Sequence, residues 1–233
     1  MRLNLLGKKY RDTILHIDSL SPSQTNNVKK IETKLGGIYN VAGIHGIEPI
    51  YSPIGQKEVT IINEIKNATC THFVRELDST LTTMVSVANN LLQDSEWLHV
   101  AYIDDLDLDI KNMIGLAPRI SVDFCTQKNR NKYKNLIDEL DLVFDSRKRA
   151  HLYNNIKSTT PIILRDEMGC EAIFMGEIVD RTTIKPFKNL NTHGANDIFA
   201  AVFIREYLTS SMSNAIKFTS HFTTKILRER VSE

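Results

Sequence analysis

The chain has 233 residues, a length that suits one large domain rather than several. Lys and Arg number 29 and Asp and Glu 28, so the formal net charge is +1, and no overall field draws the protein to nucleic acid or anionic lipid. The three cysteines form no CxxC pair, and no stretch approaches the roughly 18 apolar residues of a membrane span. We therefore expect a globular, cytoplasmic protein with no membrane segment.

The first part of the chain contains short apolar runs between polar segments. Arg2–Gly7 is expected to be a strand that ends on a glycine, and Thr13–Ile17 is a second short apolar run. Polar Ser21–Lys30 is expected to be a loop. Glu58–Lys66 carries apolar residues at helical spacing and is predicted as a helix. In Thr80–Val87 a helical stripe competes with β-branched residues, so helix and strand both remain open there.

From Trp97 onward, β-rich runs alternate with helical or polar stretches such as Lys132–Glu139. The predicted strands are Trp97–Ile103, Ile120–Phe124, Leu140–Phe144 and Pro161–Leu164, followed by a hairpin at Glu171–Phe174 and Glu177–Val179. Two helices are expected to close the chain, at about Gly194–Thr209 and Ser213–Arg228, with Ser213 as the cap of the second. The alternation indicates βαβ units, a buried parallel sheet and a single α/β domain over residues 1–233.

The sharpest local motif is Asn191–Phe199 (NTHGANDIF), in which Gly-Ala-Asn precedes an apolar helix and Asp197 lies in its first turn. The first N–H groups of a helix and its dipole suit a phosphate group. A carboxylate beside them can accept a proton from an attacking alcohol. The alternative is structural, because Asp197 is also an ordinary first-turn acid, with Thr192 or Asn191 as the helix cap.

The segment NTHGANDIFAAVFI resembles the D-T-x-G-A-G-D-x-F-x-A-G-F segment of the ribokinase-like carbohydrate kinases, the PfkB family. Earlier in the chain, LLGKKYRDTILHID is similar to the family's first strand, its glycine and the acid that follows, here Asp12. LGGIYNVA is similar to its G-G-x-x-N-x-A, which gives Gly36, Gly37 and Asn40. The resemblance covers most of the chain, although family members are longer.

The resemblance implies a role for each matching residue. Asp197 would be the base that takes the proton from the substrate hydroxyl, and the turn of Gly194, Ala195 and Asn196 would form the anion hole for the transferred phosphoryl group. Four residues would bind sugar hydroxyls: Asp12, Gly36, Gly37 and Asn40. An acid that accepts hydroxyls and an amide that both donates and accepts are the groups expected around a polyol.

The nucleotide side departs from the family pattern. Ser146-Arg147-Lys148-Arg149 stands where the family commonly has N-x-x-E, and Leu164-Arg165-Asp166 stands for its T-x-G, before Gly169. The motif also opens with Asn191 and has Asn196 for its third glycine. By position, the nucleotide-binding residues would be Ser146, Arg149, Arg165, Gly169 and Asn191.

These departures leave three interpretations open. In the first, one or more of Arg147, Lys148, Arg149 and Arg165 takes over part of the metal's role on the phosphates, for which the fork of arginine is suited. In the second, ATP binding has been lost. In the third, the basic run Arg147–Arg149 is simply a solvated face.

The resemblance implies an α/β fold of the ribokinase type: three layers, with a mostly parallel central sheet flanked by helices and a small β lid from about residues 13–35 and 70–87. The expected activity is transfer of the γ-phosphoryl group of ATP, with Mg²⁺, to a hydroxyl of a sugar, related polyol or nucleoside. A homodimer through the lid is expected, without nucleic-acid or membrane partners. The alternative is a kinase-like protein of weak or no activity that binds a sugar, a nucleoside or a protein. A nucleic-acid module on residues 127–149 ranks third, because the net charge is near zero.

Overall fold

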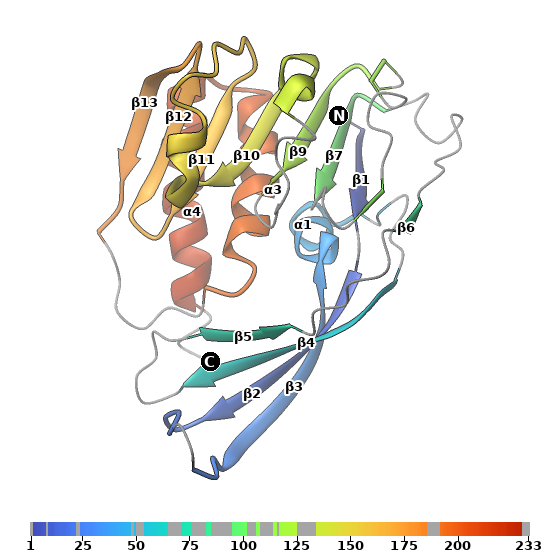
Figure 1. Ribbon diagram of the computed structural model, residues 1–233, viewed down its shortest axis with the longest axis vertical. Coiled ribbons are helices and arrows are strands. Elements are labelled where there is room, and N and C mark those ends of the chain that lie inside the picture. The colour runs from blue at the N-terminus through green and yellow to red at the C-terminus, as the bar shows by residue number, and fades with distance from the viewer. Residues whose placement is uncertain are drawn as a thin grey trace.

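A seven-stranded sheet forms the centre of the molecule (Figure 1), in a computed structural model that describes residues 2–7, 9–21, 24–47, 49, 54–64, 71–75, 83–84, 95–101, 106–107, 114–115, 117–124, 134–185 and 192–229. The strands, in spatial order, are β1 (Leu3–Gly7), β7 (Trp97–Ala101), β9 (Ile120–Asp123), β10 (Leu142–Ser146), β11 (Ile162–Asp166), β12 (Gly169–Phe174) and β13 (Glu177–Thr183). The first five run parallel, and the last two form an antiparallel edge.

The strands of this sheet are apolar because both of its faces are covered. Every residue of β1, β7 and β9 is buried, as expected for parallel strands that lie between two layers. Successive side chains alternate between the faces. In β11, Ile162 and Leu164 therefore belong to one core cluster and Ile163 to the other.

Among the described residues, three helices cover one face and two short 3₁₀ helices cover the other, which gives three layers (Figure 1). The helices are α1 (Ile38–His45), α3 (Ala195–Tyr207) and α4 (Met212–Glu229), and the 3₁₀ helices are η4 (Lys134–Glu139) and η5 (Arg147–Leu152). Eight consecutive residues of α3, from Asp197 to Ile204, are buried, because this helix packs on the sheet and has α1 and α4 as its neighbours. Helix α4 buries one stripe only. Within the described part of the chain, no helix has the length and apolar character needed to cross a bilayer.

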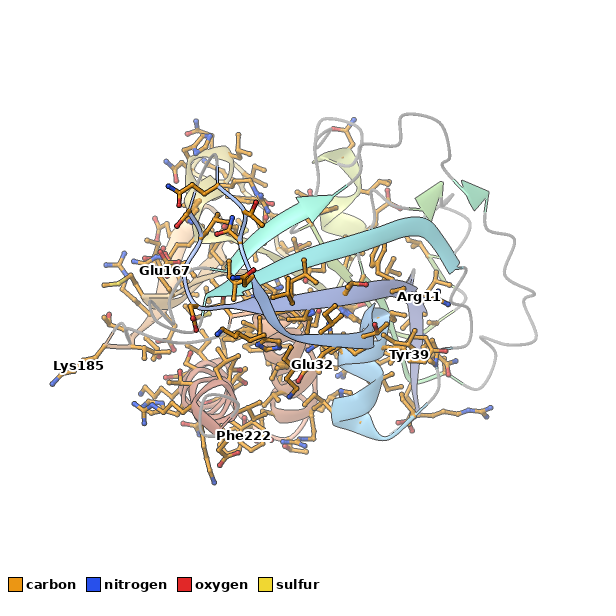
Figure 2. The ribbon with its side chains drawn as sticks, turned by 90° about the horizontal axis from the view of Figure 1, so that it is seen from below. Arg11, Glu32, Tyr39, Glu167, Lys185 and Phe222 are labelled. Atoms are coloured by element: carbon orange, nitrogen blue, oxygen red, sulfur yellow. The ribbon has the colours of Figure 1, made fainter. Side chains whose placement is uncertain are left out.

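A second sheet, with strand order β3-β2-β4-β5, lies below the central one (Figure 1). Its strands are β2 (Lys9–Ile17), β3 (Val28–Gly37), β4 (Ile54–Glu64) and β5 (Thr71–Arg75), and a separate pair joins β6 (Thr83–Met84) to β8 (Leu106–Asp107). Figure 2 shows the second sheet crossing the underside of the molecule, with α1 continuing from the end of β3. One end of the second sheet therefore lies next to the carboxyl ends of the parallel strands of the central sheet.

The predicted strands, the hairpin and the two closing helices are confirmed in the second half of the chain. The stretch predicted as helical over Lys132–Glu139 contains the 3₁₀ helix Lys134–Glu139. In the undecided Thr80–Val87, Thr83 and Met84 form a strand, and the rest lies outside the described residues. The central architecture is therefore the expected α/β fold.

Three local predictions are wrong. Glu58–Lys66 is not a helix, because residues 54–64 form β4, which pairs with β2 on one side and β5 on the other. The expected loop Ser21–Lys30 already enters β3 at Val28. Helix α4 begins at Met212, and its first turn is capped by Ser211, whose Oγ accepts a hydrogen bond from the Asn214 N–H at 3.3 Å, rather than by Ser213.

His99 lies on β7 in the centre of the fold. Its Nδ1 is 2.9 Å from the Ser121 Oγ, and its ring meets Phe144 edge to face. Burial, together with the positive charge of Arg165, lowers the pKa of His99 to about 3. The folded protein therefore keeps this imidazole neutral at a pH where the unfolded chain protonates it.

We predict that His99 makes the fold acid-sensitive. Between pH 6.5 and about 3 the unfolded state binds one more proton at this residue, so the free energy of unfolding falls by about 1.4 kcal/mol per pH unit as the pH is lowered. In urea titrations at about pH 7 and pH 5, His99→Gln should remove about 2 kcal/mol of the pH dependence seen in the wild type. His221→Gln, at an exposed position of α4, should retain it. Equal pH dependence in His99→Gln and the wild type would contradict the prediction.

Candidate active site

The first turn of α3 carries the central motif. Gly194 precedes the helix with a φ of 71°, a left-handed conformation that glycine adopts without strain. Its carbonyl accepts the first helical hydrogen bond, from the Ile198 N–H at 3.0 Å. The Ala195 N–H donates to the Thr192 carbonyl at 3.0 Å. No side chain caps the helix by a hydrogen bond, so a side-chain cap by Thr192 is not formed, and Asn191 lies outside the described residues.

Asp197 meets the amide of Asn40, which lies on α1, 157 residues earlier in the chain. Asn40 Nδ2 donates to Asp197 Oδ2 at 2.7 Å, and only 2% of Asp197 is exposed. A Cβ on Gly194 would lie 3.1 Å from the same Asn40 Nδ2, so the turn packs closely on the amide. Gly37 directly precedes α1 as its N-cap residue, with a φ of 64°, and so sets the start of the helix that carries Asn40.

Asp12 forms the second part of the site. It lies on β2 of the second sheet, is 2% exposed, and its Oδ2 is 2.8 Å from His193 Nε2. A Cβ on Gly36 would lie 1.9 Å from the same oxygen, so no side chain fits at Gly36. His193 directly precedes Gly194, and therefore the Asp12 contact and the Asn40–Asp197 contact form one continuous group.

The structure thus brings together every residue predicted for the sugar and the anion hole: Asp12, Gly36, Gly37, Asn40, Gly194, Ala195, Asn196 and Asp197. His193 was not among the site residues predicted from the sequence, although it contacts Asp12 in the structure. The only signal was its place inside the motif. Its buried contact with Asp12 joins distant parts of the chain.

Arg165 ends β11 on the side of the sheet that faces α3. Its Nη2 contacts Asp123 Oδ2 at 2.5 Å, and its Nε donates to the Asn196 side-chain oxygen at 3.1 Å. Asp123, at the end of β9, is a further residue that the sequence analysis missed. An acid at the carboxyl end of a buried strand is the signal that could have found it. Of the predicted nucleotide-binding residues that the structure describes, Arg165 is therefore the one shown in contact with the α3 turn.

Arg149 lies on the opposite face of the sheet, in an ion pair with the buried Asp145. Asp145 also accepts hydrogen bonds from the Tyr153 hydroxyl at 2.5 Å and from the Ser146 N–H at 2.6 Å. The Ser146 hydroxyl caps η5 by accepting from the Lys148 N–H at 3.3 Å. The structure does not bring Arg149 to the α3 turn, and a nucleotide contact by Ser146 or Arg149 stays a prediction.

The basic run Arg147–Arg149 is not simply a solvated face. Arg147 contacts Glu171 at 2.7 Å and Asp166 at 3.5 Å, and Arg149 pairs with Asp145, so two of its three cations are held by carboxylates. Lys148 is exposed, as expected if the run were a solvated face.

Gly169 has a structural reason to be glycine. Its φ is 136°, and a Cβ there would lie 2.0 Å from the Thr182 carbonyl oxygen on the neighbouring strand. The residue therefore allows the close pairing of β12 with β13.

No group of three or more metal-binding side chains is present among the residues that the structure describes. The two buried acids at the ends of β9 and β10, Asp123 and Asp145, each contact an arginine. The described residues therefore do not fit a metal ion held by protein ligands alone, since Mg²⁺ needs several oxygen ligands in octahedral geometry.

Sequence comparison gives no relatives: no protein-family model and no curated protein matches this chain. Its fold, however, matches solved structures of ribokinase-like sugar kinases. A microbiome-derived acarbose kinase superposes with a TM-score of 0.74 at 14% identity, covering 95% of this chain and 91% of the other. Ribokinase from Arabidopsis thaliana, complexed with ribose and ATP, gives 0.68 at 12% identity, with 97% and 92% covered. An Escherichia coli protein provisionally called ribokinase II, in complex with ATP and Mg²⁺, gives 0.69 at 11% identity, with 94% and 90% covered.

These matches confirm the predicted fold class, a ribokinase-like α/β fold with a mostly parallel central sheet. They run over nearly the whole length of each chain, so the likeness concerns the complete fold and not one motif.

We predict that the close approach of Gly36 to Asp12 tolerates no side chain. Gly36→Ala would place a Cβ 1.9 Å from Asp12 Oδ2, and displacing the buried carboxylate should lower the free energy of unfolding by about 1–3 kcal/mol. Gly43→Ala is the matched control, because Gly43 lies in α1 with nothing within 4 Å of its Cβ position. There, alanine should stabilise the helix by about 0.5–1 kcal/mol. Urea unfolding of both variants tests this, and wild-type stability of Gly36→Ala would count against the close contact.

Proposed function

We propose that this protein transfers the γ-phosphoryl group of ATP to a hydroxyl group of a sugar, a related polyol or a nucleoside. The observation that carries the proposal is the 2.7 Å hydrogen bond from Asn40 to Asp197 at the first turn of α3. It puts a buried carboxylate, an amide and a helix N-terminus in one place. Those are the groups needed to bind a hydroxyl, remove its proton and hold a phosphoryl group.

Asp197 is the proposed base. Its Oδ2 accepts the hydrogen bond from Asn40, which orients the carboxylate that would receive the proton of a substrate hydroxyl. Asp12, held by His193 and faced by Gly36, is the proposed acceptor for other hydroxyls of the same substrate. The Asp12 carboxylate comes from the second sheet and the Asp197 carboxylate from α3, so a polyol between them would be bound from two sides.

The proposed anion hole is the turn Gly194, Ala195 and Asn196. The N–H groups at the start of a helix point beyond its end and are suited to the negative charge of a transferred phosphoryl group. The Ala195 N–H donates to the Thr192 carbonyl at 3.0 Å, and this hydrogen bond fixes the shape of the turn. The charge-stabilising part of the reaction would then depend on the rigidity of this turn.

ATP is the proposed phosphoryl donor. Structural neighbours of this chain have been solved with ATP, one with ribose and one with Mg²⁺. The proposed nucleotide side consists of Ser146, Arg149, Arg165, Gly169 and Asn191. The described side chains do not form a metal site of their own; Mg²⁺ brought with ATP would supply positive charge to the phosphates.

The alternative is a protein that binds a sugar, a nucleoside or a protein partner and has little or no turnover. One observation favours it: Asp123 and Asp145, at the carboxyl ends of β9 and β10, contact arginines. Carboxylates in such pairs are poorly placed to organise a metal ion beside the phosphates. A protein with this binding function would still use Asp12 and Asn40 to contact its ligand, and it would not need Asp197 as a base.

We also propose that the second sheet is a lid and that it pairs two copies of the chain. The strands from residues 13–35 and 71–75 belong to this sheet. On its edge strand β3, Ile31 is 64% exposed and Leu35 is 49% exposed. The two are four residues apart, an even number, and therefore lie on the same face of the strand. An exposed apolar face on an edge strand is the kind of surface that a second chain covers.

The base assignment predicts that Asp197→Asn lowers phosphoryl transfer by about 10²- to 10⁴-fold, because the amide cannot accept the proton. Purified protein is incubated with ATP, Mg²⁺ and a panel of sugars, polyols and nucleosides, and ADP release is measured. Asp138→Asn, an exposed acid on η4, is the control and should match the wild type. ADP release equal in Asp197→Asn and wild type would refute the assignment, and no release with any acceptor would favour the alternative for that panel.

The lid assignment predicts a dimer that depends on β3. Sedimentation velocity should give twice the monomer mass for the wild type, whereas Ile31→Lys should shift the protein to monomer because it places a charge in the apolar contact. Val179→Lys is the matched control, since Val179 is 56% exposed on β13, the edge strand of the central sheet. A monomeric wild type, or an Ile31→Lys variant that remains dimeric, would sink this assignment.

A further inference from the structure

Two departures from the family pattern, found separately in the sequence, meet in the structure. Arg165 stands in the segment that replaces T-x-G, and Asn196 replaces the third glycine of the helix motif. They are 31 residues apart, and Arg165 Nε donates to Asn196 Oδ1 at 3.1 Å. The two departures are therefore linked: the asparagine side chain at position 196 accepts a hydrogen bond from the arginine at position 165.

Arg165 is held firmly on the side of the sheet. It is 4% exposed, and its Nη2 contacts Asp123 Oδ2 at 2.5 Å, on an aspartate that is 1% exposed. A buried cation without an opposite charge is strongly unfavourable, so the two residues fix each other. This pair joins the carboxyl end of β11 to the carboxyl end of β9.

The same guanidinium contacts α3 at a second point. Its central carbon lies 5.6 Å from the centre of the Phe199 ring on α3 and 5.3 Å from the Phe144 ring on β10. Asn196 and Phe199 are three residues apart and so share one face of the helix. Arg165 thus bridges strands β9, β10 and β11 to the first turn of α3, through an ion pair, a hydrogen bond and two ring contacts.

We propose that Arg165 is a positioning residue for phosphoryl transfer: through Asn196 and Phe199 it fixes the first turn of α3, and with it Asp197 and the N–H groups of the anion hole, against the ends of the central strands. The catalytic part of this proposal rests on the proposed function. In the family pattern quoted above, the position of Asn196 is a glycine, which has no side chain to receive a hydrogen bond. Here the asparagine gives the turn an anchor that the arginine binds.

The test uses Asn196→Ala, Arg165→Lys and the double variant. Asn196→Ala removes the hydrogen-bond acceptor from an exposed position and leaves no buried charge, so it should fold even if Arg165→Lys does not. Arg205→Lys is the control, because Arg205 lies on the same helix near its other end, where it contacts Glu206 and the Phe222 ring. Hydrogen–deuterium exchange of the peptide covering residues 192–199 is measured by mass spectrometry, alongside the kcat and KM of the wild type and variants with an acceptor found in the panel.

We expect both single variants to speed exchange of this peptide by about threefold or more, because opening of the turn becomes easier. Both should lower kcat by about tenfold, since a misplaced base costs rate. In Asn196→Ala the KM for ATP should stay within about twofold, because Asn196 is not among the proposed nucleotide-binding residues. The double variant should be no worse than Arg165→Lys alone, because the arginine acts through Asn196. Arg205→Lys should change neither quantity.

Unchanged exchange in Asn196→Ala overturns the proposal, whether or not the protein is a kinase. Faster exchange with an unchanged kcat also overturns it, since the turn would then be held for stability alone. If no acceptor supports turnover, the proposed function fails by itself, and the exchange of residues 192–199 still decides whether Arg165 positions the turn.

Discussion

The arrangement of the candidate site depends on one interaction, the hydrogen bond between Asn40 and the buried carboxylate of Asp197. Asp197 lies in the first turn of a helix whose following residues are almost all buried, so its carboxylate cannot turn away to solvent without moving the helix. A buried carboxylate needs donors, and the amide of α1 supplies one. The contact therefore fixes α1 and α3 relative to each other at the edge where the parallel strands end.

Charged pairs at that edge are divided between the two faces of the central sheet. Asp123 and Arg165 lie on the side of α3, whereas Asp145, Arg149 and Tyr153 lie on the side of η5. Successive residues of a strand point to opposite faces, which explains how neighbouring strands can end in acids that serve separate groups. Each acid contacts an arginine, so the buried charge on each face is largely balanced within the protein.

The sequence was sufficient for the central strands and for the contiguous motifs, but not for contacts made by distant residues. The buried strands were predictable because a parallel sheet covered on both faces needs continuous apolar runs, as in Trp97–Ala101. Residues 58–66 were mispredicted because Val59 and Ile62 fit a helical spacing, and pairing with β2 and β5 decides the outcome instead. In the site, Asp197 and Asn40 could be found from short motifs. The Arg165–Asn196 and Asp12–His193 contacts could not be predicted, because nothing in the sequence around one residue of each pair points to the other residue.

The Asp12–His193 pair has a consequence for access to the site. Asp12 belongs to the second sheet, whereas His193 belongs to the turn that begins α3. Both side chains are buried. Any movement of the second sheet away from the turn must therefore separate them, and the carboxylate of Asp12 then either becomes exposed to solvent or stays buried without this contact. A ligand that enters between the two parts therefore competes with an internal partner for the same oxygen. Selectivity at this entrance would favour molecules whose hydroxyls replace the imidazole contact, and an apolar molecule of equal size would leave the carboxylate unsatisfied.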